Sequence, residues 1–270
     1  MPELPEVETT RRGIEPFLVD NVITKLDVHN SNLRWPVPAE TSQLENSVVR
    51  SVDRRGKYLL IKVDAGTAIV HLGMSGSLRI NEPTEPRRKH DHVEWFLRSG
   101  QVLRLHDPRR FGCVLWQAAH TPEHTLLASL GPEPLGNEFN DDYLFHATRR
   151  RNVAIKNLIM NSHVVVGVGN IYASESLFLA GIRPGKAAKR ISKRDSTHLC
   201  ESIKSTLERS IHQGGTTLRD FVNSDGNPGY FKQSLYVYDR EGQPCKQCRS
   251  VIKQKTLGQR STYYCPTCQS

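Results

Sequence analysis

Leu130-Gly131-Pro132-Glu133-Pro134-Leu135-Gly136 divides this sequence into two parts with different patterns. A segment so rich in proline and glycine does not form the interior of a helix or a strand, and we place a domain boundary there. Short β-forming segments precede the boundary, and four-residue apolar spacing follows it. We therefore expect an α+β protein with domains at residues 1–131, 132–238 and 239–270.

The part before the boundary predicts one helix followed by strands. Glu3–Phe17 has a helical pattern. Ser99-Gly100 is a turn dipeptide between two alternating segments, which predicts an antiparallel hairpin. The segments expected to be strands are Tyr58–Val63, Ala68–Leu72, His92–Arg98, Gln101–His106 and Gly112–Gln117. These strands predict a β-sandwich or a barrel.

A long helix is expected in the part after the boundary. Leu199, Ile203, Leu207 and Ile211 recur every four residues and would share one face. Ser192 with Asp195 has the spacing of a capping box at the start of this helix. Gly214-Gly215 predicts its end.

Composition and charge restrict the class of protein. The chain has 270 residues, 37% of them hydrophobic, which is enough for a buried core. Its formal net charge of +9 favours a polyanionic partner such as nucleic acid or an acidic membrane surface. Acidic residues interrupt the amino terminus, and no segment approaches the length of a membrane span. We expect a cytoplasmic, nucleoid-associated protein without a membrane role.

Four of the six cysteines lie near the carboxyl terminus in two Cys-x-x-Cys pairs. Cys245 and Cys248 precede Cys265 and Cys268, a spacing that brings four thiolates to one tetrahedral zinc ion. Two disulfides are the alternative, and the cytosol disfavours them. Such a closed site is structural. The segment from Arg240 onward holds six basic residues and one acidic residue, which indicates a phosphate-binding finger with Arg260 as a contact; a solvated basic face is the alternative.

Val166-Gly167-Val168-Gly169-Asn170 precedes a second helical segment. The glycines permit a tight turn, and Asn170 would lie at the helix start. Free backbone amides and the helix dipole favour phosphate at such a position. A plain glycine turn is the alternative interpretation.

Pro2 follows the initiator Met1, and a small second residue normally allows Met1 to be removed. Most such prolines have no special role. The free secondary amine would have a pKa near 8, against about 10.4 for lysine, so part of it is neutral and nucleophilic at neutral pH. Attack on a sugar carbon would give an iminium that permits elimination of phosphate. Glu3 would then assist proton transfer.

The order of several motifs resembles the formamidopyrimidine-DNA glycosylases over the whole chain. The matching segments are Pro2–Thr9, Arg55–Tyr58, His71–Ser77, Asp107–Gly112, Gly167–Glu175, Gly214–Thr217 and the terminal finger. The resemblance implies an amino-terminal β-sandwich with flanking helices and a helical domain with a helix-two-turn-helix and a zinc finger. It also implies a bifunctional enzyme that removes oxidised purines from duplex DNA and nicks the strand by β,δ-elimination at damaged or abasic sites.

Catalytic roles follow from this resemblance. Pro2 would be the nucleophile at C1′ that forms a Schiff base, and Glu3 the proton donor that opens the sugar ring. Lys57 and Arg260 match family positions assigned as proton donors in β- and δ-elimination. Because lysine and arginine are reluctant acids, we interpret both as phosphate holders.

DNA contacts are implied in the same way. Met74, Arg109 and Phe111 resemble the residues that fill the space left by a flipped base; the alternative is that Met74 and Phe111 are core residues of strands. His90, Arg109 and Arg151 match DNA-contacting positions, with arginine at 151 where lysine is commoner. Thr216–Phe231 is expected to be a mobile lid.

Two other functions remain open at this point. A non-enzymatic zinc-ribbon DNA-binding protein would explain the charge and the finger. An oxidised-pyrimidine glycosylase of the endonuclease VIII type shares the Pro-Glu start, although Met74, Arg109 and Phe111 favour the oxidised-purine enzyme. We expect a monomer with one structural Zn²⁺, and we expect Cys113 and Cys200 to be buried.

Overall fold

The structure is a computed structural model that describes residues 2–215 and 235–270. The described residues form two compact units, one made of 2–128 with 213–215 and the other of 129–212 with 235–270. The expected lid, Thr216–Phe231, lies outside the described residues. The division into three domains at residues 131 and 238 stays a prediction. No helix among the described residues is long and apolar enough to cross a bilayer.

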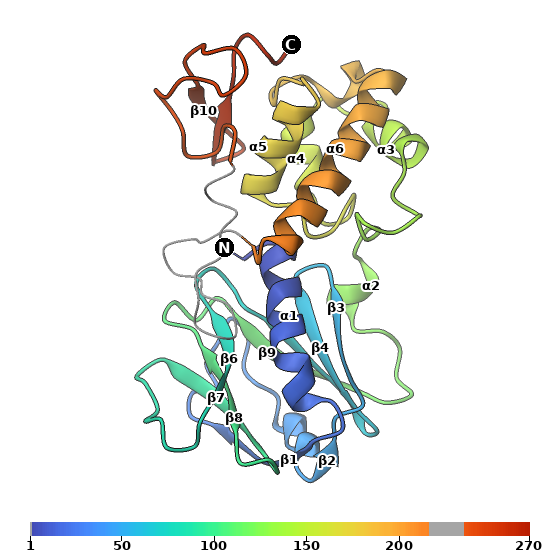
Figure 1. Cartoon of the computed structure of the whole chain (residues 1–270). Coiled ribbons are helices and arrows are strands. Elements are labelled where there is room, and N and C mark those ends of the chain that lie inside the picture. Colours follow the sequence, from blue (N-terminus) through green and yellow to red (C-terminus); the bar gives the residue numbers. More distant parts are fainter. Residues whose placement is uncertain (1, 216–234) are drawn as a thin grey trace. The chain divides into compact units, whose positions relative to one another are not determined.

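The first unit contains two antiparallel sheets, as the sequence predicted for a sandwich (Figure 1). The five-stranded sheet has the order β2-β1-β7-β8-β6, and the four-stranded sheet has the order β3-β4-β5-β9. Their bounds are β1 Val22–Val28, β2 Ser47–Val48, β3 Ser51–Arg55, β4 Tyr58–Val63, β5 Gly66–His71, β6 Ser77–Asn81, β7 Asp91–Leu97, β8 Val102–His106 and β9 Cys113–Ala118. Two short helices complete the unit, η1 Ala39–Leu44 and α2 Thr125–Ala128.

The core of this unit lies between the two sheets. Apolar side chains from both sheets form one cluster with residues of α1 (Leu4–Leu18), among them Trp95 from β7 and Ile61 from β4. The predicted strand at Tyr58–Val63 is confirmed at both ends. The hairpin around Ser99-Gly100 is also confirmed, because β7 and β8 pair antiparallel across it. Cys113 is fully buried, as expected.

Helices form most of the second unit. The bounds are α3 Asp141–Thr148, α4 Ile155–Ile159, α5 Asn170–Leu179, η2 Ala188–Arg190 and α6 Lys193–His212, with a finger hairpin of β10 Lys253–Leu257 and β11 Arg260–Tyr264. The expected capping box of α6 is present: the Ser192 backbone N–H donates to Asp195 Oδ2, and the Asp195 backbone N–H donates to Ser192 Oγ, both at 3.0 Å. Gly214 has a φ of +73° just after α6, which confirms its role in ending the helix. Cys200 is buried in α6.

Candidate nucleic-acid interface and zinc centre

Pro2 and Glu3 lie buried at the start of α1. Pro2 is buried, and the Glu3 side chain is 3% exposed. The Glu3 backbone N–H donates to Glu6 Oε2 at 2.8 Å, so the first turn of the helix is capped by its own carboxylate. Gly215, with a φ of +81°, packs against this carboxylate; a Cβ there would lie 3.2 Å from Glu6 Oε1. The two predicted catalytic residues therefore lie directly before α1, at its capped amino terminus.

A cluster of charged side chains connects α1 to the turn that carries Lys57. The Glu8 carboxylate accepts hydrogen bonds from Arg12 at 2.8 Å and from Arg54 at 3.0 Å, and it also pairs with Arg11. Burial by itself would raise the pKa of Glu8, but the hydrogen bonds of these arginines hold it below its ordinary value. Arg54 Nη1 also donates to the Gly56 backbone oxygen at 2.9 Å.

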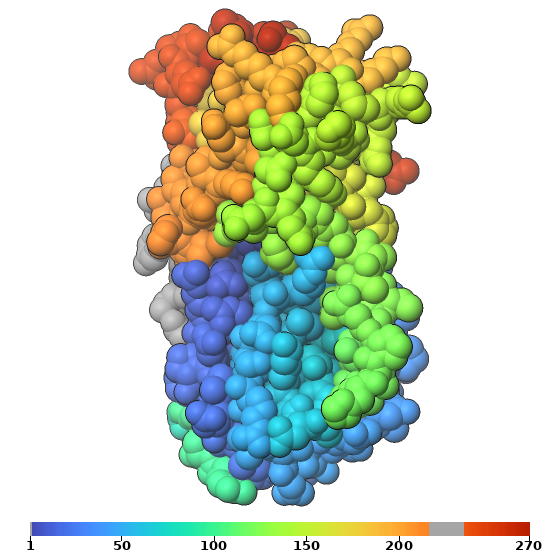
Figure 2. Space-filling view, turned by 90° about the vertical axis from the view of Figure 1, so that its right-hand side faces the viewer, coloured from blue at the N-terminus to red at the C-terminus, as the bar shows by residue number. Residues whose placement is uncertain are grey.

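Lys57 follows Gly56, whose φ of +58° makes the tight turn between β3 and β4. In Figure 2, α1 (dark blue) lies beside the segment around β3 and β4 (light blue) at the surface of the first unit. The hydrogen bonds of Arg54 to Glu8 and to the Gly56 backbone oxygen thus connect the turn before Lys57 to α1, whose N-cap is Glu3.

Two loops of the first unit approach each other at backbone distance. Gly73 has a φ of +67°, and a Cβ there would lie 2.4 Å from the Gly112 backbone nitrogen. The buried Asp107 carboxylate accepts the Gly112 backbone N–H at 2.7 Å. These contacts require glycine in both motifs, because any side chain would push residues 71–77 away from residues 107–112.

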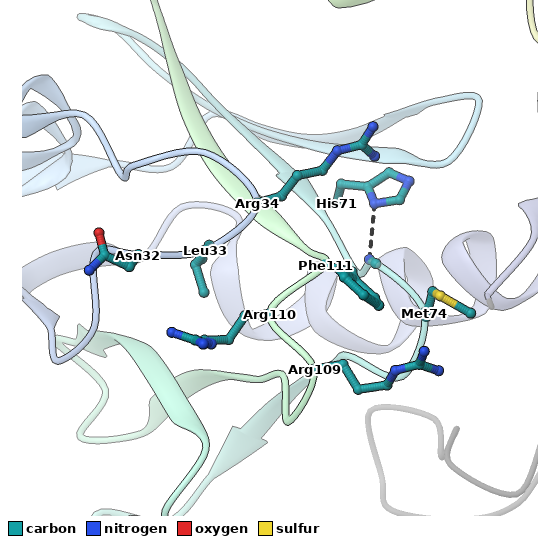
Figure 3. A pocket seen from close by; sticks show the side chains of 9 residues that line it. Asn32, Leu33, Arg34, His71, Met74, Arg109, Arg110 and Phe111 are labelled. Atoms are coloured by element: carbon teal, nitrogen blue, oxygen red, sulfur yellow. Dashed lines mark hydrogen bonds between the residues drawn. The ribbon is translucent and has the colours of Figure 1, made fainter.

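The predicted base-replacing residues line one cavity at this junction (Figure 3). The cavity has a volume of about 770 Å³. Arg109 lies over the Phe111 ring, with the guanidinium carbon 5.1 Å from the ring centroid. Phe111 is 45% exposed, so the alternative of a core residue is wrong for this side chain. The lining residues are Asn32, Leu33, Arg34, His71, Gly73, Met74, Arg109, Arg110 and Phe111.

His71, which sequence reasoning quoted only as part of a motif, also lines this cavity. Its Nδ1 accepts the Gly73 backbone N–H at 2.9 Å. Burial, together with the charges of Lys57 and Arg34, lowers the pKa of His71 to about 4. The ring is therefore neutral at physiological pH, and its proton is on Nε2, because Nδ1 acts as an acceptor. Since neither burial nor charge surroundings can be inferred from the motif, no sequence signal marked this donor.

His90 belongs to a group of three histidines next to the same loop. Its ring centroid lies 6.0 Å from those of His92 and His106. The Asp107 backbone N–H donates to the His90 backbone oxygen at 2.9 Å. His90 is partly exposed, whereas the Asp91 carboxylate beside it is buried and accepts from His106 Nδ1 at 2.7 Å.

In the second unit, Asn170 lies at the first position of α5, as predicted. Its side chain joins the helix to the finger, because Asn170 Nδ2 donates to the Ser261 backbone oxygen at 3.0 Å. Lys156 of α4 is fully buried, and its ammonium donates to Asn170 Oδ1 at 2.6 Å and to Thr262 Oγ1 at 2.7 Å. Sequence reasoning missed Lys156, since nothing local distinguishes it from a surface lysine.

Arg260 lies at the tip of the finger hairpin, where its side chain is exposed. The turn before it uses positive φ at Gly258 and Gln259, 53° and 61°. The tip packs on α4, because a Cβ on Gly258 would lie 2.6 Å from Asn157 Nδ2. Arg260 and Asn170 therefore flank the same residue, Ser261, from two different elements.

The four expected zinc ligands converge. Their Sγ atoms all lie within 4.8 Å of one another, and the Cys248 and Cys265 sulfurs are 3.4 Å apart. The backbone N–H groups of Gln247 and Cys268 point at Cys245 Sγ and Cys265 Sγ, each at 3.4 Å. A tetrahedral thiolate site needs this convergence and these amide donors, so the residues fit one structural zinc ion.

The basic run Arg149-Arg150-Arg151 is divided by its contacts. Arg149 lies over the Phe145 ring at 4.1 Å and donates to the Ile191 backbone oxygen, so it serves the packing of the second unit. Arg150 and Arg151 are exposed. The Arg151 backbone oxygen accepts from the Lys189 N–H at 2.9 Å, which fixes the loop while the side chain remains at the surface.

Comparisons with known proteins find three matching family models along the chain. Residues 1–114 match the formamidopyrimidine-DNA glycosylase N-terminal domain, and residues 130–222 match the H2TH domain of that glycosylase. Residues 242–270 match a zinc finger found in FPG and IleRS. A zinc-ribbon DNA-binding protein would not account for the amino-terminal match.

Full-length relatives carry the same name. The formamidopyrimidine-DNA glycosylase of Thioalkalivibrio sulfidiphilus is 59% identical over the whole of both chains, and that of Magnetococcus marinus is 56% identical over 100% of this chain and 99% of the relative. The crystal structure of MutM (Fpg) from Thermus thermophilus is 35% identical, with a TM-score of 0.90 over 99% of this chain and 98% of that one. A Lactococcus lactis Fpg variant bound to Fapy-dG-containing DNA is 30% identical, with a TM-score of 0.92 over all of both chains. This chain belongs to the formamidopyrimidine-DNA glycosylase family.

Proposed function

We propose that this chain is a bifunctional DNA-formamidopyrimidine glycosylase and DNA-(apurinic or apyrimidinic site) lyase. It excises oxidised purines, 8-oxoguanine and formamidopyrimidines, from duplex DNA and then cleaves the strand by β,δ-elimination. Curated relatives with this name extend over the full chain. Related solved structures hold DNA with Fapy-dG, with an abasic site or with carbocyclic 8-oxoguanine, which supports the same substrate class.

The observation that carries the chemistry is the burial of Pro2 and Glu3 at the start of α1. Removal of Met1 would give Pro2 a secondary amine, whose ordinary pKa near 8 leaves part of it neutral and nucleophilic at neutral pH. The nitrogen lone pair attacks C1′, the bond to the damaged base breaks, and Glu3 donates the proton that opens the sugar ring. The resulting iminium accepts electrons when C2′ loses its proton and the 3′ phosphate leaves. A second elimination releases the 5′ phosphate.

Met74, Arg109 and Phe111 would enter the duplex when the base leaves the stack. Their cavity is lined by apolar surface and by guanidinium groups, and Phe111 is already exposed. Phe111 and Met74 offset lost stacking, and Arg109 can donate hydrogen bonds to the acceptors of the orphaned cytosine. The neutral His71 Nε2–H and the Lys57 ammonium would hold the sugar-phosphate backbone beside them.

The second unit would contribute further phosphate contacts through Asn170, Arg260 and Arg151, and His90 would add one from the first unit. Cys245, Cys248, Cys265 and Cys268 would hold one zinc ion, which would stabilise the finger that carries Arg260 and would have a structural role. We further propose that the enzyme acts as a monomer in the cytoplasm, associated with the nucleoid.

Borohydride trapping tests the amine mechanism. A duplex with one 8-oxoguanine opposite cytosine is incubated with the protein, the imine is reduced, and the attached peptide is mapped. Attachment at Pro2 is the expected result, with Lys57→Gln still trapped because Lys57 is not the nucleophile. Selective acetylation of the amino terminus should abolish the adduct. An adduct on a lysine, or tight binding without any adduct, would contradict the mechanism.

A further inference from the structure

A second, smaller cavity lies on the outer side of the five-stranded sheet. It has a volume of about 300 Å³. We call it the serine-arginine pocket, and its lining residues are Ser75, Ser77, Arg79, Arg88, His106, Pro108 and Arg109. Three of these side chains are guanidinium groups, and the lining includes no carboxylate.

The sheet register explains the charge in this pocket. Ser77 of β6, His106 of β8 and Asp91 of β7 form one cross-strand row, and the Asp91 carboxylate is already bound to His106 at 2.7 Å. Arg79, Arg104 and Glu94 form the next row, where Glu94 pairs with Arg104 at 2.6 Å. Each of these two carboxylates thus pairs with a side chain of β8. Arg79 on the edge strand β6 is left without a carboxylate partner in its row.

Arg79 is the positively charged residue that this arrangement leaves without an ion pair. Among residues 2–215 and 235–270, no carboxylate lies within ion-pair distance of its guanidinium, and its buried Nε has no hydrogen-bond partner. Arg88 is held loosely, with its Nε 3.7 Å from Asp91 Oδ2 and its side chain 45% exposed. Burial and the charge of Arg88 lower the pKa of Arg79, and the charges of Asp91 and Glu85 offset this only in part. The guanidinium would therefore gain from an anion in the pocket.

Two buried serine hydroxyls point to a ligand independently of the charges. Ser75 is 6% exposed and Ser77 is 2% exposed. Within the described part of the chain, neither Oγ has a hydrogen-bond partner. A buried hydroxyl without a hydrogen-bond partner is unfavourable, and this cost is removed when a ligand oxygen accepts a hydrogen bond from the hydroxyl.

The chemistry of the lining selects the ligand class. Guanidinium groups and hydroxyls are donors that match the several oxygens of a phosphate. The volume is at the lower limit for small-molecule sites, and the lining offers no aromatic surface except the imidazole of His106, so a nucleobase fits poorly. We therefore expect one tetrahedral oxyanion.

Arg109 identifies the source of that anion, since it lines both this pocket and the cavity of Met74 and Phe111. We propose that the serine-arginine pocket binds a backbone phosphate of the duplex, through Ser75, Ser77, Arg79 and Arg88. This proposal rests on the DNA-binding function above and adds residues to it. The contact is independent of sequence and of damage, because it involves no base.

Salt-dependent DNA binding tests the proposal. Binding to an undamaged duplex and to one with a tetrahydrofuran abasic analogue is measured by fluorescence anisotropy at several KCl concentrations. Arg79→Met should reduce the slope of log K against log salt by about 0.9, the value for one phosphate contact. The double variant Ser75→Ala, Ser77→Ala should lower the affinity for both duplexes by about threefold to tenfold. The slope should not change, because the variant removes uncharged donors.

Arg98→Met is the matched control, because Arg98 is exposed in the β7–β8 turn outside the pocket. The serine variant also guards against misfolding, since neither Ser75 Oγ nor Ser77 Oγ makes a hydrogen bond with the described part of the protein. If both pocket variants bind DNA like the wild type and like the control, the proposal is overturned. Stabilisation of the wild type by inorganic phosphate, with DNA binding unaffected in the variants, would assign the pocket to a free anion and would also overturn it. The affinity for an undamaged duplex does not depend on base excision. The binding experiment therefore tests the pocket even if borohydride trapping fails.

Discussion

The two units hold their predicted DNA-contacting groups in different ways. In the second unit, Asn170 is fixed by side-chain hydrogen bonds, with its amide bound between Lys156 and the Ser261 backbone. In the first unit, Met74, Arg109 and Phe111 stand on loops that are fixed through backbone contacts of Gly73, Gly112 and Asp107. The difference suits the two proposed tasks. A phosphate would be bound by donors whose positions are already fixed, whereas residues that enter the duplex would need side chains that remain accessible.

Removal of one zinc ligand should have the largest effect on DNA binding. It is expected to unfold the finger of the second unit, where the predicted DNA-contacting groups depend on side-chain contacts. Cys265→Ser is expected to lose its zinc and to weaken DNA binding by about tenfold or more, since the ion would link the two Cys-x-x-Cys turns on either side of the Arg260 hairpin. Metal content by atomic emission and affinity by anisotropy check this. Cys200→Ala, a buried cysteine outside the cluster, should keep its zinc. A Cys265→Ser protein that retains both zinc and affinity would refute the finger assignment.

Lys156→Met should break the side-chain network directly. The change leaves Asn170 Oδ1 and Thr262 Oγ1 without their donor in a buried place, and we expect a loss of about 3–4 kcal/mol in the free energy of unfolding. Urea unfolding provides the measurement. Lys253→Met on exposed β10 is the control and should be nearly neutral. Equal stability of the two variants would show that the network contributes little.

Gly73→Ala should disrupt the backbone contacts between residues 71–77 and residues 107–112 in the first unit. Its Cβ would meet the Gly112 nitrogen at 2.4 Å at a positive φ, so we expect a loss of about 2–3 kcal/mol and a displaced Phe111 loop. Gly100→Ala separates the two causes, because Gly100 also has a positive φ but nothing lies within 4 Å of its Cβ position. That control should lose only about 1 kcal/mol from backbone strain. A Gly73→Ala protein no less stable than the control would show that the loops can separate freely.

The smallest expected effect concerns the protonation of His71. Its folded-state pKa of about 4 lies below the ordinary 6.5, so its contribution to stability is complete above pH 6.5 and is lost as the pH falls towards 4. Between pH 7 and pH 4.5, the free energy of unfolding of the wild type should fall by about 2 kcal/mol more than that of His71→Gln. The reason is that only the wild type must keep this ring neutral. Unfolding curves at the two pH values measure the difference. Identical pH responses would mean that His71 titrates normally.

Local sequence signals predicted a substantial part of the fold. The capping box of Ser192 and Asp195, the hairpin at Ser99-Gly100 and the strand Tyr58–Val63 all depend on residues a few positions apart, and each is present. The cysteine spacing predicted the four-sulfur cluster because each Cys-x-x-Cys pair forms a local turn, and 16 residues between the pairs let the two turns converge. The remaining choice between sandwich and barrel was undecided in the sequence, because strand order depends on pairing between distant segments.

The sequence by itself determined which residue types are available for the chemistry: a proline at position 2, four cysteines in two pairs, and glycines in the motifs around Met74 and Phe111. Only the tertiary structure decided that Lys156 is buried against residues more than a hundred positions away, that His71 is kept neutral, and that Ser75, Ser77 and Arg79 line a pocket without an acid. Burial and electrostatic environment are properties of the folded surroundings. No local pattern encodes them, because the same lysine, histidine or arginine would be solvated and ordinary if different segments packed around it.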